Sequence, residues 1–422
     1  MPYVLGVDIG RTRGVAAVRR RLPGGGFDAP EIGRLDGGTR WVSSVLVLAG
    51  DGEVLVGQAA ERAAAEHPDR VARSVVDRVG DDTAVLLGGE LYPAENLLAA
   101  LVAWIVDTVA DAEGEQPERL ALTHPPDWGP YRRGLLHDAL TAAGLPGVVL
   151  VPTVVAAAEA YQDTAPLAAG STIVVTLLGG HRVEHAVLRR TQNAFELVGQ
   201  HVTTDAGAAL DDALARYVLA HVAAHPGPTD HTVPDIRATR SMAPFRAACV
   251  TAKERLSVAT EVRVPVPHLG TDVAVTRARF DELAHPLLAP AITATRALLA
   301  RAPADTVAVL AGGTARVPLV AALSDCAVLD DPGGAAARGA ALAISPRPEL
   351  RRIGSGNAVA VPDPESDPHL PRVPVLPAAL STVDVPDEPP PRPPVHVTPP
   401  RQPSGRFPRP RRPRHDEDED PR

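Results

Sequence analysis

The spacing of apolar and polar residues divides the chain into alternating strand-like and helix-like segments up to about residue 344. The chain opens with an apolar strand expected at 3–7, a turn that contains glycine, and a second strand at 15–19. This order predicts a hairpin rather than a strand that leads directly into a helix. Between residues 93 and 109 the apolar residues recur at helical spacing, which predicts an amphipathic helix.

The same plan occurs a second time along the chain. A hairpin is expected at 172–178 and 183–189, again around a glycine-bearing turn, and helices follow it. Thr276 is expected to cap a long helix that reaches Leu299. A plan that occurs twice predicts two similar lobes rather than one doubly wound sheet. The other expected strands lie at 42–48, 120–123, 148–151, 195–198 and 306–310, and the other expected helices at 127–143, up to 161, and at 207–223, 239–257, 316–324 and 333–344.

Proline dominates the chain from residue 345 onward, as in DEPPPRPPVHVTPPRQP. Such a segment lacks many of the amide donors that helices and sheets need, and it favours extended polyproline conformations. A basic run, RFPRPRRPR, and then an acidic run, DEDED, come near its end. We therefore predict that 345–422 is a disordered tail, whose Pro-x-x-Pro repeats suit binding to an unknown protein partner.

Composition narrows the class of protein further. The formal net charge is −9, and nucleic-acid binders usually carry a basic excess, so no nucleic-acid partner is expected. The two cysteines are too few for a disulfide framework or a cysteine-based zinc site. The chain does not begin with the pattern of a signal peptide, and no stretch approaches the roughly 20 apolar residues of a membrane span. We expect a cytoplasmic protein without a membrane span.

Several common catalytic motifs are absent from the sequence. A Walker phosphate loop needs Gly-Lys-Ser/Thr, but the only lysine of the chain, Lys253, follows an alanine. The lysine and the His-Arg-Asp loop of protein kinases, the G-x-S-x-G elbow and the H-E-x-x-H zinc motif are also missing. Three glycine-bearing turns remain, and their backbone N–H groups can form a nest for an anion. They read GVDIGRTRG (6–14), LLGGHRVEH (177–185) and LAGGTARVP (310–318).

Seven segments occur in the same order as motifs of a known family, and they read GVDIG, LTHPPDWGPYRRGLLHDALTAAGL, VPTVVAAAEAY, AKERLS, FDEL, VLAGGTARVP and DPGGAAARGAA. Through these motifs, residues 3–344 resemble the nucleotide-binding domain of the heat-shock protein 70 (DnaK-type) chaperones, within the actin/sugar-kinase superfamily. The resemblance implies an α/β, two-lobed actin-like (ribonuclease H-like) ATPase fold with duplicated lobes. It places the domain at 1–344, with lobe I at about 1–160, lobe II at about 161–325 and a closing helix at 331–344.

The resemblance also implies where ATP or ADP would bind. Asp8 matches the first of two family aspartates that hold a hydrated magnesium ion, and it is the one candidate catalytic residue. Lys253 and Ser257 match adenosine contacts, and a spacing of four would place them on one helix face. The full set of nucleotide-binding candidates is Gly10, Arg11, Thr12, Arg13, Gly179, Gly180, Arg182, Lys253, Ser257, Gly312, Gly313 and Arg316.

The sequence departs from the family pattern at the positions that carry the chemistry. The second magnesium-holding aspartate falls on Leu177, the catalytic glutamate on Val151 and the catalytic lysine on Val76. The Gly-Gly-Gly-Thr of the second hairpin is replaced by Gly179-Gly180-His181-Arg182. Phosphoryl transfer depends on positioning and charge stabilisation, so these changes predict weak or absent hydrolysis.

Three hypotheses for the function follow. The first is a nucleotide-dependent chaperone-like or regulatory module that binds ATP or ADP and lacks a peptide-binding domain. The second is a nucleotide-free pseudo-enzyme scaffold that recruits partners through the Pro-rich tail. The third is an active ATPase or sugar kinase, for which Asp205 and Asp211 are the nearest candidate aspartates. Arg11, Arg13 and Arg182 either contact phosphates directly or are solvated turn residues at an inactive site.

Overall fold

The computed structural model describes residues 1–50, 52–204, 206–224, 242–267 and 270–345. The predicted disordered tail lies outside the described residues from residue 346 onward, so disorder there stays a prediction. Asp205 also lies outside them.

The first sheet is built around the hairpin that the apolar pattern predicts. β1 (Tyr3–Ile9) pairs antiparallel with β2 (Arg13–Arg20) and parallel with β10 (Arg119–His124). β11 (Val149–Pro152) pairs parallel with β10, and the order across the sheet is β11-β10-β1-β2-β3, with β3 (Glu31–Ile32) at one edge. β1 is almost wholly apolar because both of its faces are buried: alternate residues from Tyr3 to Ile9 lie in a core with α2 (Ala94–Glu113) and α3 (Pro130–Ala142), and Val4 lies in a second core with residues 336–344.

The strand expected at 42–48 is split into two short strands that belong to different sheets. β4 (Val42–Ser43) pairs with β2, whereas β5 (Leu46–Leu48) pairs with β6 (Val54–Val56) and β7 (Val71–Ala72). The break lies at Ser44, whose backbone N–H donates to the carbonyl of Thr12 at 3.0 Å and whose hydroxyl donates to the carbonyl of Gly10 at 2.9 Å. The prediction of one continuous strand is therefore wrong, because residues 42–44 bind β2 and the first hairpin turn, whereas residues 46–48 pair in another sheet. α1 (Gly57–Glu66) and the hairpin of β8 (Val85–Leu87) and β9 (Glu90–Tyr92) complete this part of the chain.

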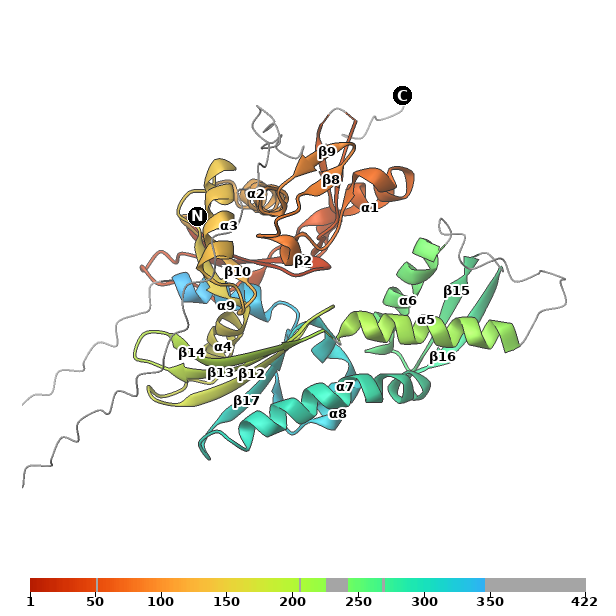
Figure 1. Ribbon diagram of the computed structural model, residues 1–422. Coiled ribbons are helices and arrows are strands. Elements are labelled where there is room, and N and C mark those ends of the chain that lie inside the picture. Colours follow the sequence, from red (N-terminus) through yellow and green to blue (C-terminus); the bar gives the residue numbers. More distant parts are fainter. Residues whose placement is uncertain (51, 205, 225–241, 268–269, 346–422) are drawn as a thin grey trace, which may run out of the picture. The chain divides into compact units, whose positions relative to one another are not determined.

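The second sheet repeats the plan of the first (Figure 1). β12 (Thr172–Leu178) and β13 (Val183–Arg190) form an antiparallel hairpin, and β12 pairs parallel with β17 (Val307–Ala311), as β1 pairs with β10. β14 (Phe195–Thr203) and β18 (Ala327–Val328) lie at the two edges, in the order β14-β13-β12-β17-β18. Two sheets, each with an antiparallel hairpin that continues into a parallel pair, form the predicted two-lobed actin-like ATPase fold. We call the elements around the first sheet lobe I and those around the second sheet lobe II.

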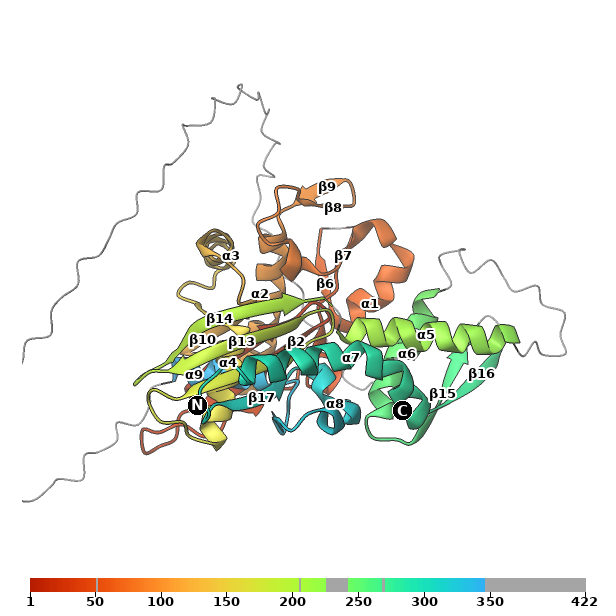
Figure 2. The same ribbon diagram turned by 60° about the horizontal axis from the view of Figure 1, so that its bottom comes forward.

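A further core of lobe II lies among three helices and a hairpin. α5 (Gly207–Ala224), α6 (Met242–Leu256) and α7 (Arg277–Leu299) share it with β15 (Glu261–Val266) and β16 (Thr271–Thr276), and Figure 2 shows these elements beside one another. The capping prediction for α7 is confirmed, because the Thr276 hydroxyl accepts a hydrogen bond from Arg279 N–H. The hairpin was not predicted, although buried and exposed residues alternate along both strands. After β17, the short helix α8 (Pro318–Leu323) packs against α7.

Two alanine-rich helices cross between the lobes. α4 (Thr153–Thr164) follows the first sheet but shares a core with strands of the second, whereas α9 (Ala335–Ile344) follows the second sheet but packs on β1 and β10. The helices approach so closely that a Cβ at Gly339 would overlap the carbonyl of Ala156. Each lobe therefore contributes one helix to the other, and small residues at the crossing make the contact possible.

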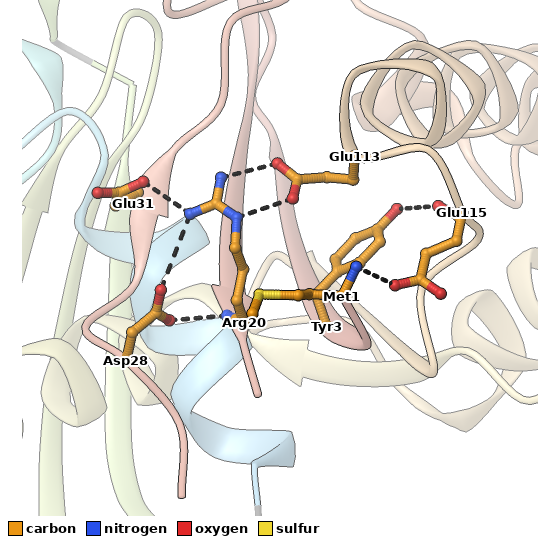
Figure 3. A network of polar contacts seen from close by, with 7 residues as sticks. All are labelled: Met1, Tyr3, Arg20, Asp28, Glu31, Glu113 and Glu115. Carbon is orange, nitrogen blue, oxygen red and sulfur yellow. Dashed lines mark hydrogen bonds and ion pairs between the residues drawn. The ribbon is translucent and has the colours of Figure 1, made fainter. Parts of the chain in front are cut away.

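A polar network fixes the start of β1 to the end of α2 (Figure 3). The Arg20 guanidinium donates to both carboxylate oxygens of Glu113, at 2.7 and 2.8 Å, and to Glu31 at 2.8 Å. Tyr3 lies beside it, and its hydroxyl donates to the carbonyl of Glu115 at 3.0 Å. Burial of the ring raises the pKa of the Tyr3 hydroxyl, so this group stays a hydrogen-bond donor. The network holds the first hairpin at the end remote from its turn.

Candidate functional site

The turns of the two hairpins have the same backbone geometry. In the first turn Gly10 N–H donates to the carbonyl of Arg13 at 2.9 Å, and in the second Gly179 N–H donates to the carbonyl of Arg182 at 2.8 Å. The next two amides, Arg11 and Thr12 in one turn and Gly180 and His181 in the other, have no backbone or side-chain acceptor among the described residues. Consecutive N–H groups of this kind are suited to binding an anion.

The two turns also contact each other. The Thr12 side chain covers Gly180, and its hydroxyl oxygen lies 3.0 Å from the position that a Cβ at residue 180 would take. The structure therefore brings the first turn, with Gly10 and Thr12, against the second turn, with Gly179 and Gly180, and a shared phosphate site there stays a prediction. At this contact the Thr12 side chain fills the space between the two turns.

Each hairpin carries one carboxylate next to its turn, but on opposite strands. Asp8 lies on β1 and pairs across the hairpin with Val15, whereas Glu184 lies on β13 and pairs with Leu177. Sequence reasoning missed Glu184, because it considered only the strand that enters the second turn. The available signal was an acidic residue in the middle of an apolar strand, VEHAVL.

Both carboxylates are held by threonine hydroxyls. Thr123 on β10 donates to Asp8 Oδ1, and Thr153 at the start of α4 donates to Glu184 Oε2. Burial raises the pKa of the Asp8 carboxyl, and burial raises the pKa of Glu184 to about 7 although Thr153 and Arg182 oppose the shift. The environment of these two groups therefore favours their neutral forms.

Arg11 and Arg13 of the first turn are each paired with an acidic side chain. Arg11 Nε lies 2.5 Å from Asp77 Oδ2, within the short 3₁₀ helix Val75–Arg78. Arg13 Nη2 lies 2.6 Å from Glu254 Oε1 on α6, and its guanidinium lies 3.8 Å from the centre of the Trp41 ring. Neither arginine is a simple solvated turn residue, and the Arg13–Glu254 pair joins lobe I to lobe II.

Arg182 of the second turn lies among three carboxylates. Its Nη2 donates to Asp127 Oδ2 at 2.8 Å, Nη1 lies 3.8 Å from Asp77 Oδ1, and Nε lies 3.6 Å from Glu184 Oε1. Asp77 therefore contacts both Arg11 and Arg182. Because Asp77 and Asp127 belong to lobe I and Arg182 to lobe II, this guanidinium also bridges the lobes.

The three positions where the family pattern places charged groups are apolar side chains in the core. Val76 lies in the 3₁₀ helix beside Asp77 and is buried, and Val151 on β11 is buried and pairs with Thr123. Leu177 is half-buried and packs against the core of the second sheet. None of the three can donate or accept a hydrogen bond through its side chain, so they supply no group that could position water, metal or phosphate.

Lys253, one of the predicted adenosine contacts, is linked to the second turn through the start of α5. Lys253 Nζ donates to Asp211 Oδ2 at 2.8 Å and to the carbonyl of Gly207 at 3.0 Å. Gly207 N–H in turn donates to the carbonyl of Gly179 at 3.1 Å. Asp211 is thus the ion-pair partner of Lys253, which argues against a separate role for it as a sugar-kinase base.

The remaining adenosine-side candidates are arranged less simply. Gly312 has φ of +89°, and a Cβ there would overlap the carbonyl of Leu178, so this glycine is required by packing within the lobe. Gly313 faces open space, as a ligand contact requires. Arg316 is half-exposed and its Nη2 lies 2.5 Å from Asp331 Oδ1. Ser257 lies in the turn after α6, because α6 ends at Leu256, so the prediction that it shares a helix face with Lys253 is wrong.

The residues present do not fit a magnesium ion. Among the described residues there is no group of three or more His, Cys, Asp or Glu side chains that could hold a metal ion. Asp8 accepts from Thr123, and the position that matches it in the second hairpin is Leu177, which cannot accept a hydrogen bond from a hard cation's water shell. The magnesium role predicted for Asp8 therefore gains no support from this geometry. The donors do fit the phosphates of a nucleotide, since two pairs of amides and the buried Arg182 Nε–H, none with an acceptor in the part of the chain that the structure describes, lie at the paired turns.

Two cavities lie away from the turns and contain none of the predicted site residues. One, of about 400 Å³, is lined by Arg296, Leu299 and residues 306–308 and 325–327, and the other, of about 1060 Å³, lies beside the ends of β10, β11 and α9. No helix within the described residues is long and apolar enough to cross a membrane. The cytoplasmic location stays a prediction.

Comparison with known proteins adds to this geometry. The family model described as "Hsp70 protein" matches residues 69–332. A curated relative, "Heat shock 70 kDa protein BIP3" of Oryza sativa subsp. japonica, is 28% identical over 356 residues, which cover 75% of this chain and 51% of the relative. The chain thus spans about half the length of that relative.

Proposed function

Because this chain belongs to the Hsp70 protein family, we propose that it binds ATP or ADP, hydrolyses ATP slowly or not at all, and acts as a nucleotide-dependent regulatory or chaperone-like module. Domains of this family bind ATP or ADP, and the fold here is the one that carries that site. The partner that would respond to the bound nucleotide is unknown, and the Pro-rich tail is a candidate for binding it.

Nucleotide binding is supported above all by the paired turns. Two glycine turns with the same internal hydrogen bond meet at Thr12 and Gly180, and each offers two consecutive amides. Arg11 and Arg182 lie beside these amides. Burial lowers the pKa of His181, and the nearby charges of Arg11 and Lys253 lower it further. A polyphosphate is the ligand class that matches converging amides and guanidinium groups.

Slow hydrolysis is supported by the three apolar positions. An enzyme must place charged or hydrogen-bonding groups around the transferring phosphoryl group and the attacking water. Val76, Val151 and Leu177 offer none, and removing one such group typically lowers the rate by about 10²–10³-fold. Losing several should leave turnover near the uncatalysed background.

The binding proposal is tested by isothermal titration of the purified chain with ATP and with ADP. We expect saturable heat with both ligands, and an increase of the melting temperature in their presence. Gly180→Val would put a branched side chain against Thr12 between the turns and should lower the affinity by about tenfold or more. Gly199→Val is the matched control, because Gly199 lies on β14 with no atom near its Cβ position. No heat and no melting shift at millimolar nucleotide would contradict the proposal.

The hydrolysis proposal needs a separate measurement of phosphate release. We expect no turnover above background, and no difference between the natural chain and Asp8→Ala. Steady turnover that disappears in Asp8→Ala would instead favour the active ATPase or kinase.

One observation favours a nucleotide-free scaffold as the second candidate. The ion pairs Arg182–Asp127 and Arg13–Glu254 join the lobes through the chain's own side chains, so closure has a source of stabilisation other than a ligand. In that case titration would be silent, while the isolated chain would still melt as one cooperative unit. The titration described above therefore distinguishes the two candidates.

A further inference from the structure

The strongest feature that the family resemblance does not explain is the position of the Arg182 guanidinium. Its three nearest carboxylates come from three elements: Asp77 from the 3₁₀ helix, Asp127 from the segment before α3, and Glu184 from β13. The Arg182 side chain is 22% exposed and that of Glu184 is 7% exposed, so water screens this contact only in part. A single guanidinium, with one positive charge, thus lies among three carboxylates that come from both lobes.

Only one nitrogen of the guanidinium makes a hydrogen bond to a described residue, since Nη2 donates to Asp127 Oδ2 while Nη1 lies 3.8 Å from Asp77 Oδ1. Nε is buried, has no hydrogen-bond partner among the described residues, and lies 3.6 Å from Glu184 Oε1. A buried donor without a partner is costly, and ligands or ordered water commonly satisfy such groups. The amides of Gly180 and His181, in the turn that precedes Arg182, likewise have no acceptor among the described residues.

The charges around Arg182 are already balanced without a divalent ion. Asp77 and Asp127 are matched by Arg11 and Arg182, while Asp8 and Glu184 are held by threonine hydroxyls in a buried setting. A hydrated dication placed here would meet the positive guanidinium of Arg182 and the alkyl side chain of Leu177, and it would find no carboxylate that is not already shared.

We propose that the nucleotide is bound as the metal-free polyphosphate anion, with the Arg182 guanidinium in the place of a divalent cation. This inference rests on the proposed nucleotide binding and specifies the form of the ligand. Phosphate oxygens accept from Arg182 Nε–H and from the amides of the two turns. Asp77 and Asp127 hold the guanidinium across the lobes, so a phosphate that binds there also touches the bridge between them. Mg²⁺ in solution works against this binding, because it neutralises the phosphates that the arginines attract.

The direct test is the affinity for ATP and ADP measured by titration in excess EDTA and in millimolar Mg²⁺. We expect the affinity in EDTA to equal or exceed the affinity in Mg²⁺. Binding that needs Mg²⁺ would overturn the inference and leave the proposed function intact. Binding in neither buffer would overturn both.

A variant test follows from the same geometry. Arg182→Gln removes the guanidinium and its charge but keeps a polar, unbranched side chain, and it should weaken ATP binding in EDTA by about tenfold or more. Arg189→Gln is the control, since Arg189 is an exposed residue of β13, the strand that follows this turn. An equal affinity of the natural chain and Arg182→Gln in EDTA would overturn the inference, provided that melting curves show both to be folded.

The double variant Leu177→Asp, Arg182→Thr tests whether the site can be converted into one that binds the nucleotide together with Mg²⁺. It restores the family residues at both positions, so ATP binding should become stronger in Mg²⁺ than in EDTA. If this variant does not fold, Arg182→Thr alone serves, because removing the guanidinium leaves Asp127 and Glu184 without their cation and Asp77 with Arg11 alone. An unchanged ratio of the two affinities in the folded variant would count against Arg182 as the substitute for the metal.

Discussion

The two hairpins at the centre of this protein share a backbone and differ in chemistry. Both turns contain the same glycine-to-carbonyl hydrogen bond, and in both the residue that accepts it is an arginine, Arg13 in lobe I and Arg182 in lobe II. Both arginines reach acidic partners in the opposite lobe, Glu254 and Asp127 respectively. The repeated scaffold therefore supplies two equivalent ion pairs between the lobes, Arg13–Glu254 and Arg182–Asp127, which we call the two arms.

The carboxylates break this equivalence. Asp8 precedes the first turn on β1, and the position that matches it on β12 is Leu177. The second hairpin has its carboxylate on the opposite strand, where Glu184 matches Val15 of the first. A pair of like carboxylates facing each other across the site would favour a shared cation, whereas this arrangement pairs one carboxylate with the guanidinium of Arg182. The two hairpins therefore have the same backbone, but the charged side chains beside their turns differ in position and in partner.

The largest expected effect is the dependence of stability on pH that Glu184 of the second hairpin contributes. Burial raises the pKa of Glu184 to about 7, above its ordinary value of 4.5. Between these pH values the folded chain keeps a proton that the unfolded chain has released, so the free energy of unfolding falls as pH rises through this window. Because Gln cannot ionise, Glu184→Gln should stabilise the chain by about 2–3 kcal/mol at pH 8 and by little at pH 4.

Denaturant unfolding at both pH values measures this effect. Glu196→Gln is the control, since Glu196 is an exposed residue of β14. The same change in unfolding free energy at pH 8 and pH 4 would show that the pKa of Glu184 is the same in the folded and unfolded chain, so that burial does not raise it.

The contrast could be predicted only in part from the sequence. The hairpins, the parallel strands and the Thr276 cap follow from apolar spacing and local hydrogen bonding, because those signals lie within a few residues of one another. The split at Ser44 could not be predicted, since its partners are the carbonyls of Gly10 and Thr12, more than thirty positions away. Tertiary contacts decided that break.

The candidate site shows the same limit. The glycine-bearing turns can be recognised in the sequence, but the acidic partners of the arginines in these turns cannot. Asp77, Asp127 and Glu254 come from three separate segments, and only folding shows that they meet Arg11, Arg182 and Arg13. Ser257 was misplaced for a local reason, because one further residue of helix was assumed beyond Leu256.

The next largest effect concerns the strength of the two arms between the lobes. The side chain of Arg182 is less exposed than that of Arg13, at 22% against 30%. Arg182 also lies near two carboxylates other than Asp127, those of Asp77 and Glu184. A double-mutant cycle of Arg182→Gln with Asp127→Asn should give a coupling of about 1–2 kcal/mol. The cycle of Arg13→Gln with Glu254→Gln should give about 0.5 kcal/mol or less, as is usual for exposed pairs. Both are measured by denaturant unfolding, and equal couplings would mean that the arms are interchangeable.

The smallest effect tests whether the two turns, alike in hydrogen bonding, are equally tight. A Cβ at Gly179 would lie 2.9 Å from the carbonyl oxygen of Arg182, whereas a Cβ at Gly10 would lie 3.4 Å from that of Arg13. The obstacle is backbone in both turns, so it cannot rotate away as a side chain would, and the closer turn must shift. Gly179→Ala should destabilise the chain by about 1 kcal/mol, and Gly10→Ala by close to zero because alanine also restricts the unfolded chain. If thermal or denaturant unfolding gave the same loss for both variants, the two turns would be equivalent in packing as well as in hydrogen bonding, and only the side chains around them would distinguish the lobes.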